Sequence, residues 1–264
     1  SSYGYRGIQM EKVVLKKVYR QSELDFLEIL NGIRINQTTP DLLDLLNTRV
    51  DPDFEPMKDK FFITLVATNA LANKINQREL EKLPGEVQVS KAHITGALSK
   101  SEFPAELEVN FKVGSQIMML NNDAENRWVN GTLATIEEIN LDSTKRDPHL
   151  IVKIASSGER YEVTKHVWDI KRPRSIGNKL VYDTIGTFIQ FPFMLAWAVT
   201  IHKSQGKTFE NVIIDLTSKA FAAGQLYVAL SRCTTLDGIV LRQPIDSAQV
   251  ILDERVMDFH IDDL

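Results

Sequence analysis

The sequence contains a single cysteine, Cys233, among 264 residues. One cysteine excludes a disulfide framework within the chain and a zinc site made of several thiolates. Cys233 stands beside Ser231 and Arg232 in an apolar segment, which favours a small buried side chain over a nucleophile. This cysteine use predicts a reducing compartment, and we expect the protein in the cytoplasm, most simply that of a bacterium.

Long apolar runs are also absent. The longest, at about residues 188–201, is interrupted by Gln190 and Pro192 and is too short to span a bilayer. The first ten residues, SSYGYRGIQM, lack the charged and apolar regions of a secretory signal. We therefore expect a soluble protein with no membrane partner, and the missing initiator Met predicts a piece of a longer polypeptide.

The chain has no excess of positive charge. It carries 31 Lys and Arg against 35 Asp and Glu, a formal net charge of −4. This balance predicts no strong non-specific attraction to nucleic acid, so any such contact has to be local. The length suits one large domain or two modest ones.

A complete phosphate-binding P-loop is absent as well. Gly206-Lys207-Thr208 resembles the end of one, but the pattern needs another glycine five residues earlier, where Ile201 stands. The side chains between these positions would occupy space that bare backbone needs to wrap a phosphate. The polar turn at residues 200–208 therefore has another role.

Strands and helices alternate in the first and last parts of the chain, which predicts an α/β fold with a parallel sheet. Ser22 and Asp25 resemble a capping box that opens a helix, and Gly32 is a plausible stop for it. Thr39 followed by Pro40 predicts a second helix start. The expected strands are 12–19, 61–67, 194–199, 212–216 and 238–242, and the expected helices are 23–31, 40–47, one from about 69, and 224–232.

The middle of the chain has a different pattern. From about 103 to 170 the runs are short and alternating, and Asn130-Gly131 and Ser157-Gly158 are hairpin-turn signals between them. Short strands at this spacing predict a small β-barrel. The simplest topology is an α/β domain interrupted by an inserted barrel.

Four stretches could carry chemistry, and each has a structural alternative. The turn at 200–208 follows a buried strand, where open α/β sheets place ligands, but a solvated loop is also polar. Arg232 could reach a γ-phosphate or could complement a helix dipole. Tyr19 and Arg20 could stack on a base and clamp a phosphate, or form an ordinary surface pair. The basic stretch 165–179, which contains Trp168, suits single-stranded nucleic acid or a solvated linker.

Taken in order, these stretches resemble the C-terminal half of the superfamily 1B DNA helicases, the PIF and RecD-like family. VVLKKVYRQSELDFLEILNGIR is similar to motif IV and its helix, and LVATNALANKIN to the segment after it. FKVGSQIMMLNNDAENRWVNGTLATI resembles the start of the inserted subdomain 2B. LAWAVTIHKSQGKTF resembles motif V, and GQLYVALSRCTTLDGIVL resembles motif VI. The resemblance covers almost the whole chain, and its last two motifs are highly specific.

The resemblance implies a fold and domain boundaries. We expect a RecA-like parallel-sheet α/β domain, 2A, in two segments, 8–102 and 173–264. An SH3-like β-barrel, 2B, would occupy 103–172 between them.

The resemblance also implies roles for residues. Arg20 and Arg232 would be arginine fingers at the ATP γ-phosphate, with Gln205 as the third catalytic residue. The implied ATP-binding residues are these three with Tyr19 and Gly206, and the implied DNA-binding residues are Asn69, Thr200, His202 and Lys203. Related helicases of the other subgroup carry Glu where Thr208 stands, so no ribose contact is assigned to Thr208.

The first RecA-like domain of the family is missing from this sequence, including its P-loop, its acidic pair and its Gly-Asp-x-x-Gln motif. ATP and Mg²⁺ would be held mainly by that domain, and no metal site is expected in this chain. The implied partners are single-stranded DNA or a DNA fork, and the N-terminal RecA-like domain of the same polypeptide. The family moves 5′→3′ on DNA. The alternative is a separate, non-catalytic nucleic-acid-binding module derived from a helicase half.

Overall fold

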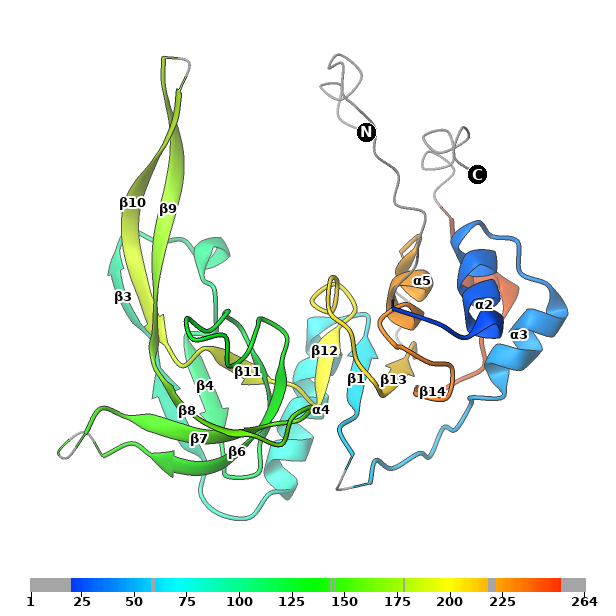
Figure 1. Cartoon of the computed structure of the whole chain (residues 1–264), viewed down its shortest axis with the longest axis horizontal. Coiled ribbons are helices and arrows are strands. Elements are labelled where there is room, and N and C mark those ends of the chain that lie inside the picture. The colour runs from blue at the N-terminus through cyan, green and yellow to red at the C-terminus, as the bar shows by residue number, and fades with distance from the viewer. Residues whose placement is uncertain are drawn as a thin grey trace.

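The computed structural model describes residues 20–57, 60–142, 144, 146–177, 179–217 and 222–252. Helices and a parallel sheet form one part of the molecule, and antiparallel strands form the other (Figure 1). The strand expected at 12–19, which includes the candidate Tyr19, lies outside the described residues. No helix in the described ranges is both long enough and apolar enough to cross a membrane.

A four-stranded parallel sheet organises the first part, and its strand order is β12-β1-β13-β14. The strands are β1 (Ile63–Val66), β12 (Ala198–Thr200), β13 (Val212–Asp215) and β14 (Ile239–Leu241). β1 lies between β12 and β13, with Thr64 paired to Ala198 on one side and to Ile213 on the other. The expected α/β fold with a parallel sheet is confirmed.

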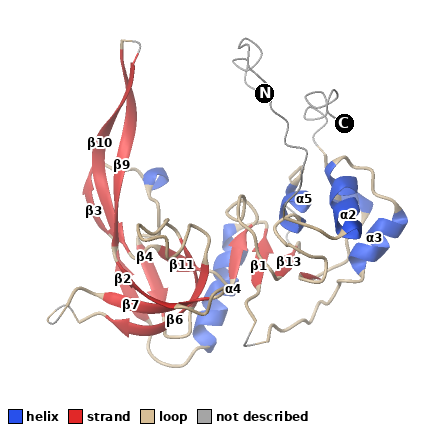
Figure 2. Cartoon of the chain, viewed as in Figure 1, coloured by secondary structure: helices blue, strands red, loops and turns tan. Residues whose placement is uncertain are grey.

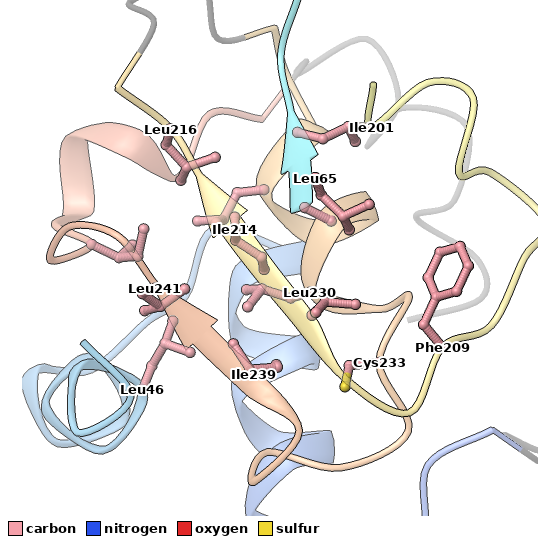
Figure 3. Packing of buried hydrophobic residues seen from close by; sticks show 14 of the residues in the cluster. Leu46, Leu65, Ile201, Phe209, Ile214, Leu216, Leu230, Cys233, Ile239 and Leu241 are labelled. Carbon is pink, nitrogen blue, oxygen red and sulfur yellow. The ribbon is translucent and has the colours of Figure 1, made fainter. Parts of the chain in front are cut away.

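Helices cover both faces of this sheet because its strands are apolar on both sides. α2 (Leu24–Arg34), α3 (Pro40–Asn47) and α5 (Gln225–Leu230) pack on one face. Figure 3 shows this core, where Leu46 and Leu230 approach Ile214 and Leu241 of the sheet. α4 (Asn69–Lys82) covers the other face, where Val66 and Ala198 pack in a separate small cluster.

Helix ends agree only in part with the sequence signals. The Thr39 hydroxyl accepts a hydrogen bond from the Leu42 amide at 3.3 Å, so the expected cap before Pro40 is confirmed. The Ser22 capping box is wrong, because Glu23 is the N-cap residue of α2 and its side chain makes no capping bond. Gly32 does not end α2. It lies within the helix and is buried. A Cβ at this position would stand 3.2 Å from the Gln37 carbonyl oxygen, so there is little room for a side chain.

The second part consists of antiparallel sheets. A five-stranded sheet has the order β11-β5-β6-β7-β8, a three-stranded sheet has the order β3-β10-β9, and β2 pairs with β4. The bounds are β2 (Gln88–Lys91), β3 (His93–Gly96), β4 (Glu108–Phe111), β5 (Gln116–Met119), β6 (Leu133–Asn140), β7 (His149–Ile154), β8 (Arg160–Thr164), β9 (His166–Ile176), β10 (Lys179–Gln190) and β11 (Phe193–Leu195). Phe111, Ile117, Trp128 and Phe193 contribute to its separate core.

The expected closed barrel is not seen. β8 and β11 are the outer strands of the five-stranded sheet, and no pairing joins them among the described residues. Both turn signals are confirmed, since Gly131 and Gly158 have φ angles of 101° and 72° next to strand ends. Antiparallel strands run from residue 88 to residue 195, beyond both ends of the expected insertion.

The basic stretch at 165–179 is not a linker. It contains all of β9 (His166–Ile176), which pairs with β10 (Lys179–Gln190) in a long two-stranded ribbon. Figure 2 shows this ribbon extending well beyond the other strands. Ion pairs from Arg172 to Glu102 and from Arg174 to Asp183 explain why a charged sequence can remain a strand.

The strand expected at 194–199 is two strands of two different sheets. Leu195 ends β11 in the antiparallel sheet, and Ala198 begins β12 in the parallel sheet. The Ala196 amide donates to the Gln116 carbonyl at 2.9 Å, while the Trp197 carbonyl accepts from the Thr64 amide at 2.8 Å. Successive peptide groups therefore pair with different sheets, and an unbroken apolar run does not reveal the change of partner.

Candidate functional site

Arg20 and Arg232 come together although they are far apart in the chain. Arg20 precedes α2, and its Nε donates to the Thr208 hydroxyl at 2.8 Å while its Nη1 donates to the Ser231 carbonyl at 2.9 Å. Arg232 follows α5, and its Nη2 donates to the Ser231 hydroxyl at 2.8 Å. Both guanidinium groups therefore meet at Ser231. We call Arg20, Thr208, Ser231 and Arg232 the arginine corner.

Neighbouring bonds hold this corner in place. The buried Gln21 amide donates to the carbonyls of Ser231 and Cys233 at 3.2 and 2.9 Å, which ties the segment before α2 to the segment after α5. Arg232 Nε donates to the Val228 carbonyl of α5 at 2.9 Å. Because α5 is packed into the core, this bond holds the Nε side of the Arg232 guanidinium.

The arginine corner suits an anion. Arg232 is only 9% exposed. Burial lowers the pKa of Arg232, and the nearby positive charge of Arg20 lowers it further. The acceptors of their hydrogen bonds are neutral hydroxyl and carbonyl oxygens, so neither charge is neutralised by these bonds. An anion with several oxygens, such as a phosphate, would relieve the repulsion and match the planar donors.

The turn at 200–208 connects the carboxyl edge of the parallel sheet, where its strands end, with the amino edge, where they begin. β12 and β13 both run parallel to β1, so the chain must cross from the carboxyl end of β12 to the amino end of β13. Ile201 begins the crossing, where its amide donates to the Val66 carbonyl at 2.9 Å. Phe209 ends it, where its amide donates to the Arg232 carbonyl at 2.9 Å. One segment thus reaches both the carboxyl edge and the arginine corner.

The candidate DNA-binding residues gather at the carboxyl edge. Asn69, Thr200 and Lys203 line one groove of about 200 Å³ between α4, β12 and the antiparallel strands. Thr200 is buried, and its hydroxyl accepts from the Lys203 amide at 3.3 Å. His202 is exposed and is not among the residues that line the groove. The structure therefore brings three of the four candidates together.

The groove has two chemically different walls. Asn69, Asn73 and Gln77 of α4 present amides from one side, together with Lys203. Glu106 and Glu108 present carboxylates from the antiparallel side. A phosphate backbone would therefore contact the α4 wall, because the carboxylates repel it.

Gln205 and Gly206 lie in the middle of the crossing in exposed positions. Gly206 has a φ angle of 78°, and a Cβ there would meet nothing within 4 Å. Their assigned roles at the nucleotide stay predictions.

Several residues of these sites were not expected from the sequence. Asn73 and Gln77 follow Asn69 at intervals of four, a spacing that places their amides on one helix face and was readable in the sequence. Gln21 is the immediate neighbour of the candidate Arg20 in the sequence, and this position was the only sign that it belongs to the site. The contact between Lys207 and Asn130, at 2.7 Å, joins residues 77 positions apart and has no local signal.

Metal ligands do not cluster in the described part of the chain. No group of three or more His, Cys, Asp or Glu side chains there could hold a metal ion. Cys233 is buried, and burial raises the pKa of its thiol to about 11, so it is not an activated nucleophile.

Comparisons with known proteins show what this chain is similar to. Residues 195–239 match the model of the UvrD-like helicase C-terminal domain. The ATP-dependent DNA helicase Pif1 of Bdellovibrio bacteriovorus is 30% identical over 256 residues, which cover 95% of this chain and 54% of that protein. The chain thus spans about half the length of this relative.

Solved structures show the same relationship. Unliganded Pif1 from Bacteroides has a TM-score of 0.80 and 35% identity, with coverage of 93% of this chain and 55% of that one. The Bacteroides Pif1 helicase in complex with ADP-AlF3 and ssDNA has a TM-score of 0.71 and 35% identity, with coverage of 95% and 56%. The resemblance expected from the motifs is confirmed over nearly the whole chain.

Proposed function

Because the chain corresponds to the C-terminal half of the Pif1-type DNA helicases, we propose that it supplies arginine fingers and a DNA-binding surface to an ATP-dependent DNA helicase. The observation that carries this proposal is the convergence of Arg20 and Arg232 on Ser231. A buried Arg232 and a half-buried Arg20, both bonded to neutral oxygens, are suited to the charge that develops on a transferring γ-phosphoryl group.

ATP and Mg²⁺ would be held mainly by another RecA-like domain of the same polypeptide. The arginine corner fits the triphosphate, since its donors are charged and fixed. The described part of the chain does not provide a carboxylate cluster for Mg²⁺. In this arrangement the arginines of this chain stabilise transferring charge, while a P-loop in the other domain cradles the phosphates.

Single-stranded DNA or one strand of a fork would lie along the groove at the carboxyl edge. Asn69, Thr200 and Lys203 would contact its phosphates, with His202 beside them. The antiparallel part would serve as the 2B subdomain with an SH3-like arrangement, and movement along DNA would be 5′→3′. The crossing segment would carry the response to DNA toward the arginine corner, because it touches both places.

The test compares two purified proteins, the 264-residue chain and the full polypeptide that contains it. The full protein is expected to hydrolyse ATP faster when an oligonucleotide is added, and to unwind a duplex with a 5′ single-stranded tail. The chain alone is expected to bind a fluorescent single-stranded oligonucleotide and to show no ATP turnover.

Turnover by the chain alone would contradict the proposed division of labour between two domains. Oligonucleotide binding by a full protein that has no ATPase would instead support the separate binding module as the function. Unwinding only from a 3′ tail would overturn the polarity and leave the other assignments in place.

A further inference from the structure

Lys207 lies between the arginine corner and the antiparallel sheets. Its backbone carbonyl accepts a hydrogen bond from Arg232 Nη1 at 3.3 Å. Its side-chain Nζ donates to Oδ1 of Asn130 at 2.7 Å. One residue therefore contacts a candidate arginine finger through its backbone and the insertion through its side chain.

The insertion offers Lys207 a well-defined acceptor. The Asn130 amide hydrogen is donated to Asn122 Oδ1 at 2.9 Å, and its side-chain nitrogen donates to the Leu120 carbonyl at 3.1 Å. These two bonds fix the side-chain oxygen that Lys207 meets.

Gly131 makes room for the lysine stem. It has a φ angle of 101°, and a Cβ there would stand 3.0 Å from both Cδ and Nζ of Lys207. A side chain at this position would be strained and would collide with Lys207. Burial beside this turn also lowers the pKa of the Lys207 ammonium group.

The loop around this acceptor is internally braced. Arg127 donates to Asp123 through Nε at 2.8 Å and through Nη2 at 2.7 Å. The Trp128 indole donates to Asn121 Oδ1 at 3.0 Å, and the ring lies in the core of the insertion. A displacement of the inserted sheets would therefore carry Asn130 with it.

On the side of the arginine corner, the backbone around Lys207 is held at two points. Its amide donates to the Ser204 carbonyl at 3.0 Å, and Phe209 is bound to Arg232 two residues later. A pull through the Lys207 side chain would therefore act on the peptide groups between these two bonds, which include the carbonyl that Arg232 Nη1 meets.

We propose that Lys207 is a positioning residue that sets the direction of the Arg232 guanidinium according to the position of the insertion. The proposal rests on the proposed function, because it concerns the ATP turnover that Arg232 supports. It makes the insertion a controlling element for hydrolysis as well as a contact for DNA.

The test uses the full polypeptide and measures kcat and KM for ATP at saturating single-stranded oligonucleotide. Lys207→Met, which keeps the apolar stem and removes the ammonium group, is expected to lower kcat about 10-fold or more, since small misplacement of a catalytic group is costly. KM for ATP is expected to change little, because an arginine finger acts in the transition state. Lys207→Arg, which keeps a donor, is expected to retain most of kcat.

Asn130→Ala is expected to reproduce the effect of Lys207→Met, and the double variant is expected to be no worse than either single variant. Lys153→Met is the matched control. This exposed lysine also lies beside a turn glycine, with its Cε 3.9 Å from a Cβ placed on Gly158, but it is on β7 within the insertion. Thermal unfolding of each variant separates loss of positioning from loss of fold.

The outcomes distinguish the two proposals. If the full protein turns over ATP, Arg232→Ala abolishes turnover and Lys207→Met matches wild type, this inference is wrong and the proposed function stands. Additive losses in the double variant, or a loss explained by lower thermal stability, also overturn the inference. If the full protein has no DNA-stimulated ATPase, both proposals fail together.

Discussion

The Nε of Arg20 donates to the Thr208 hydroxyl at 2.8 Å, across 188 positions of the sequence. The bond joins the segment before α2 to the end of the crossing between β12 and β13. Thr208 belongs to a triplet that resembles a P-loop, yet its hydroxyl accepts from an arginine. The resemblance of Gly206-Lys207-Thr208 to a phosphate loop is therefore coincidental at this threonine.

Removal of either arginine is expected to abolish most hydrolysis by the full polypeptide. Arg20→Ala and Arg232→Ala should each lower kcat for ATP about 10³-fold or more, the scale of an arginine finger. Thr208→Val should cost less, about 10-fold, because it removes one hydrogen bond of the charged guanidinium while the Nη1 bond of Arg20 remains. Steady-state ATPase assays measure all three.

Arg146→Ala is the control for this series. Arg146 pairs with Glu162 on the surface of the insertion, and its side chain is 63% exposed. Its removal should leave kcat unchanged. Near-normal turnover of Arg232→Ala would show that Arg232 only completes the end of α5.

Lys203→Ala is expected to weaken binding of a single-stranded oligonucleotide by about 1.5–3 kcal/mol, the scale of a hydrogen bond to a charged group. The magnitude of the slope of log K against log salt should fall by about 1, because one phosphate contact is lost. Fluorescence anisotropy at several salt concentrations measures both quantities. An unchanged slope would mean that Lys203 lines the groove without contacting a phosphate.

His202→Ala tests the position next to the groove. If His202 holds a DNA phosphate, this variant should lose about 1–2 kcal/mol of binding and should also blunt the DNA stimulation of ATPase. The same assay as for Lys203 applies. Wild-type affinity and stimulation would remove His202 from the DNA-binding set.

The acidic wall gives a prediction of opposite sign. Glu106→Gln and Glu108→Gln keep the shape of the groove and remove a negative charge that faces the proposed DNA path. Affinity for single-stranded DNA should rise about two- to fivefold at low salt for each variant, and the gain should shrink as salt screens the charges. Glu28→Gln, at an exposed position of α2 outside the groove lining, is the control. A loss of affinity would place the carboxylates as acceptors for the bases.

Acid should release the brace of the loop that contains Asn130. Arg127 and nearby backbone amides hold the pKa of Asp123 at about 2, below its ordinary value of 3.8. A depressed carboxylate pKa stabilises the fold above the unfolded-state value, and this stabilisation is lost as pH falls through 3.8 toward about 2. Asp123→Asn should therefore lower thermal stability at pH 7, and its difference from wild type should shrink steadily between pH 4 and pH 2. A constant difference would exclude ionisation as the cause.

The sequence was sufficient for the parallel-sheet class, since that class rests on local patterns. The apolar strands on either side of the crossing are separated by a polar turn, and Thr39-Pro40 carries a capping signal that works through neighbouring residues. Arg20 and Arg232 could be paired only through the family resemblance, because no periodicity relates residues on separate elements.

The errors share a different cause. The apolar run at 193–200 hides a change of sheet, because hydrophobicity is the same on both sides of the change. The charged stretch of β9 looks like a linker because its stabilising partners, Glu102 and Asp183, lie elsewhere in the sequence. Long-range pairing decides both cases, and a single sequence gives no direct signal for it.

The passage from β11 to β12 also has a mechanical consequence. Only Ala196 and Trp197 separate the two strands, and two residues span at most about 7 Å when fully extended. The Gln116 side chain reinforces this tie by donating to the carbonyls of Phe62 and Ala196, both at 2.8 Å. A pull on the antiparallel sheets therefore reaches β12 with almost no slack. The ladder between β12 and β1 would then bear the load, so tension on the insertion is felt at the strand that ends in Thr200.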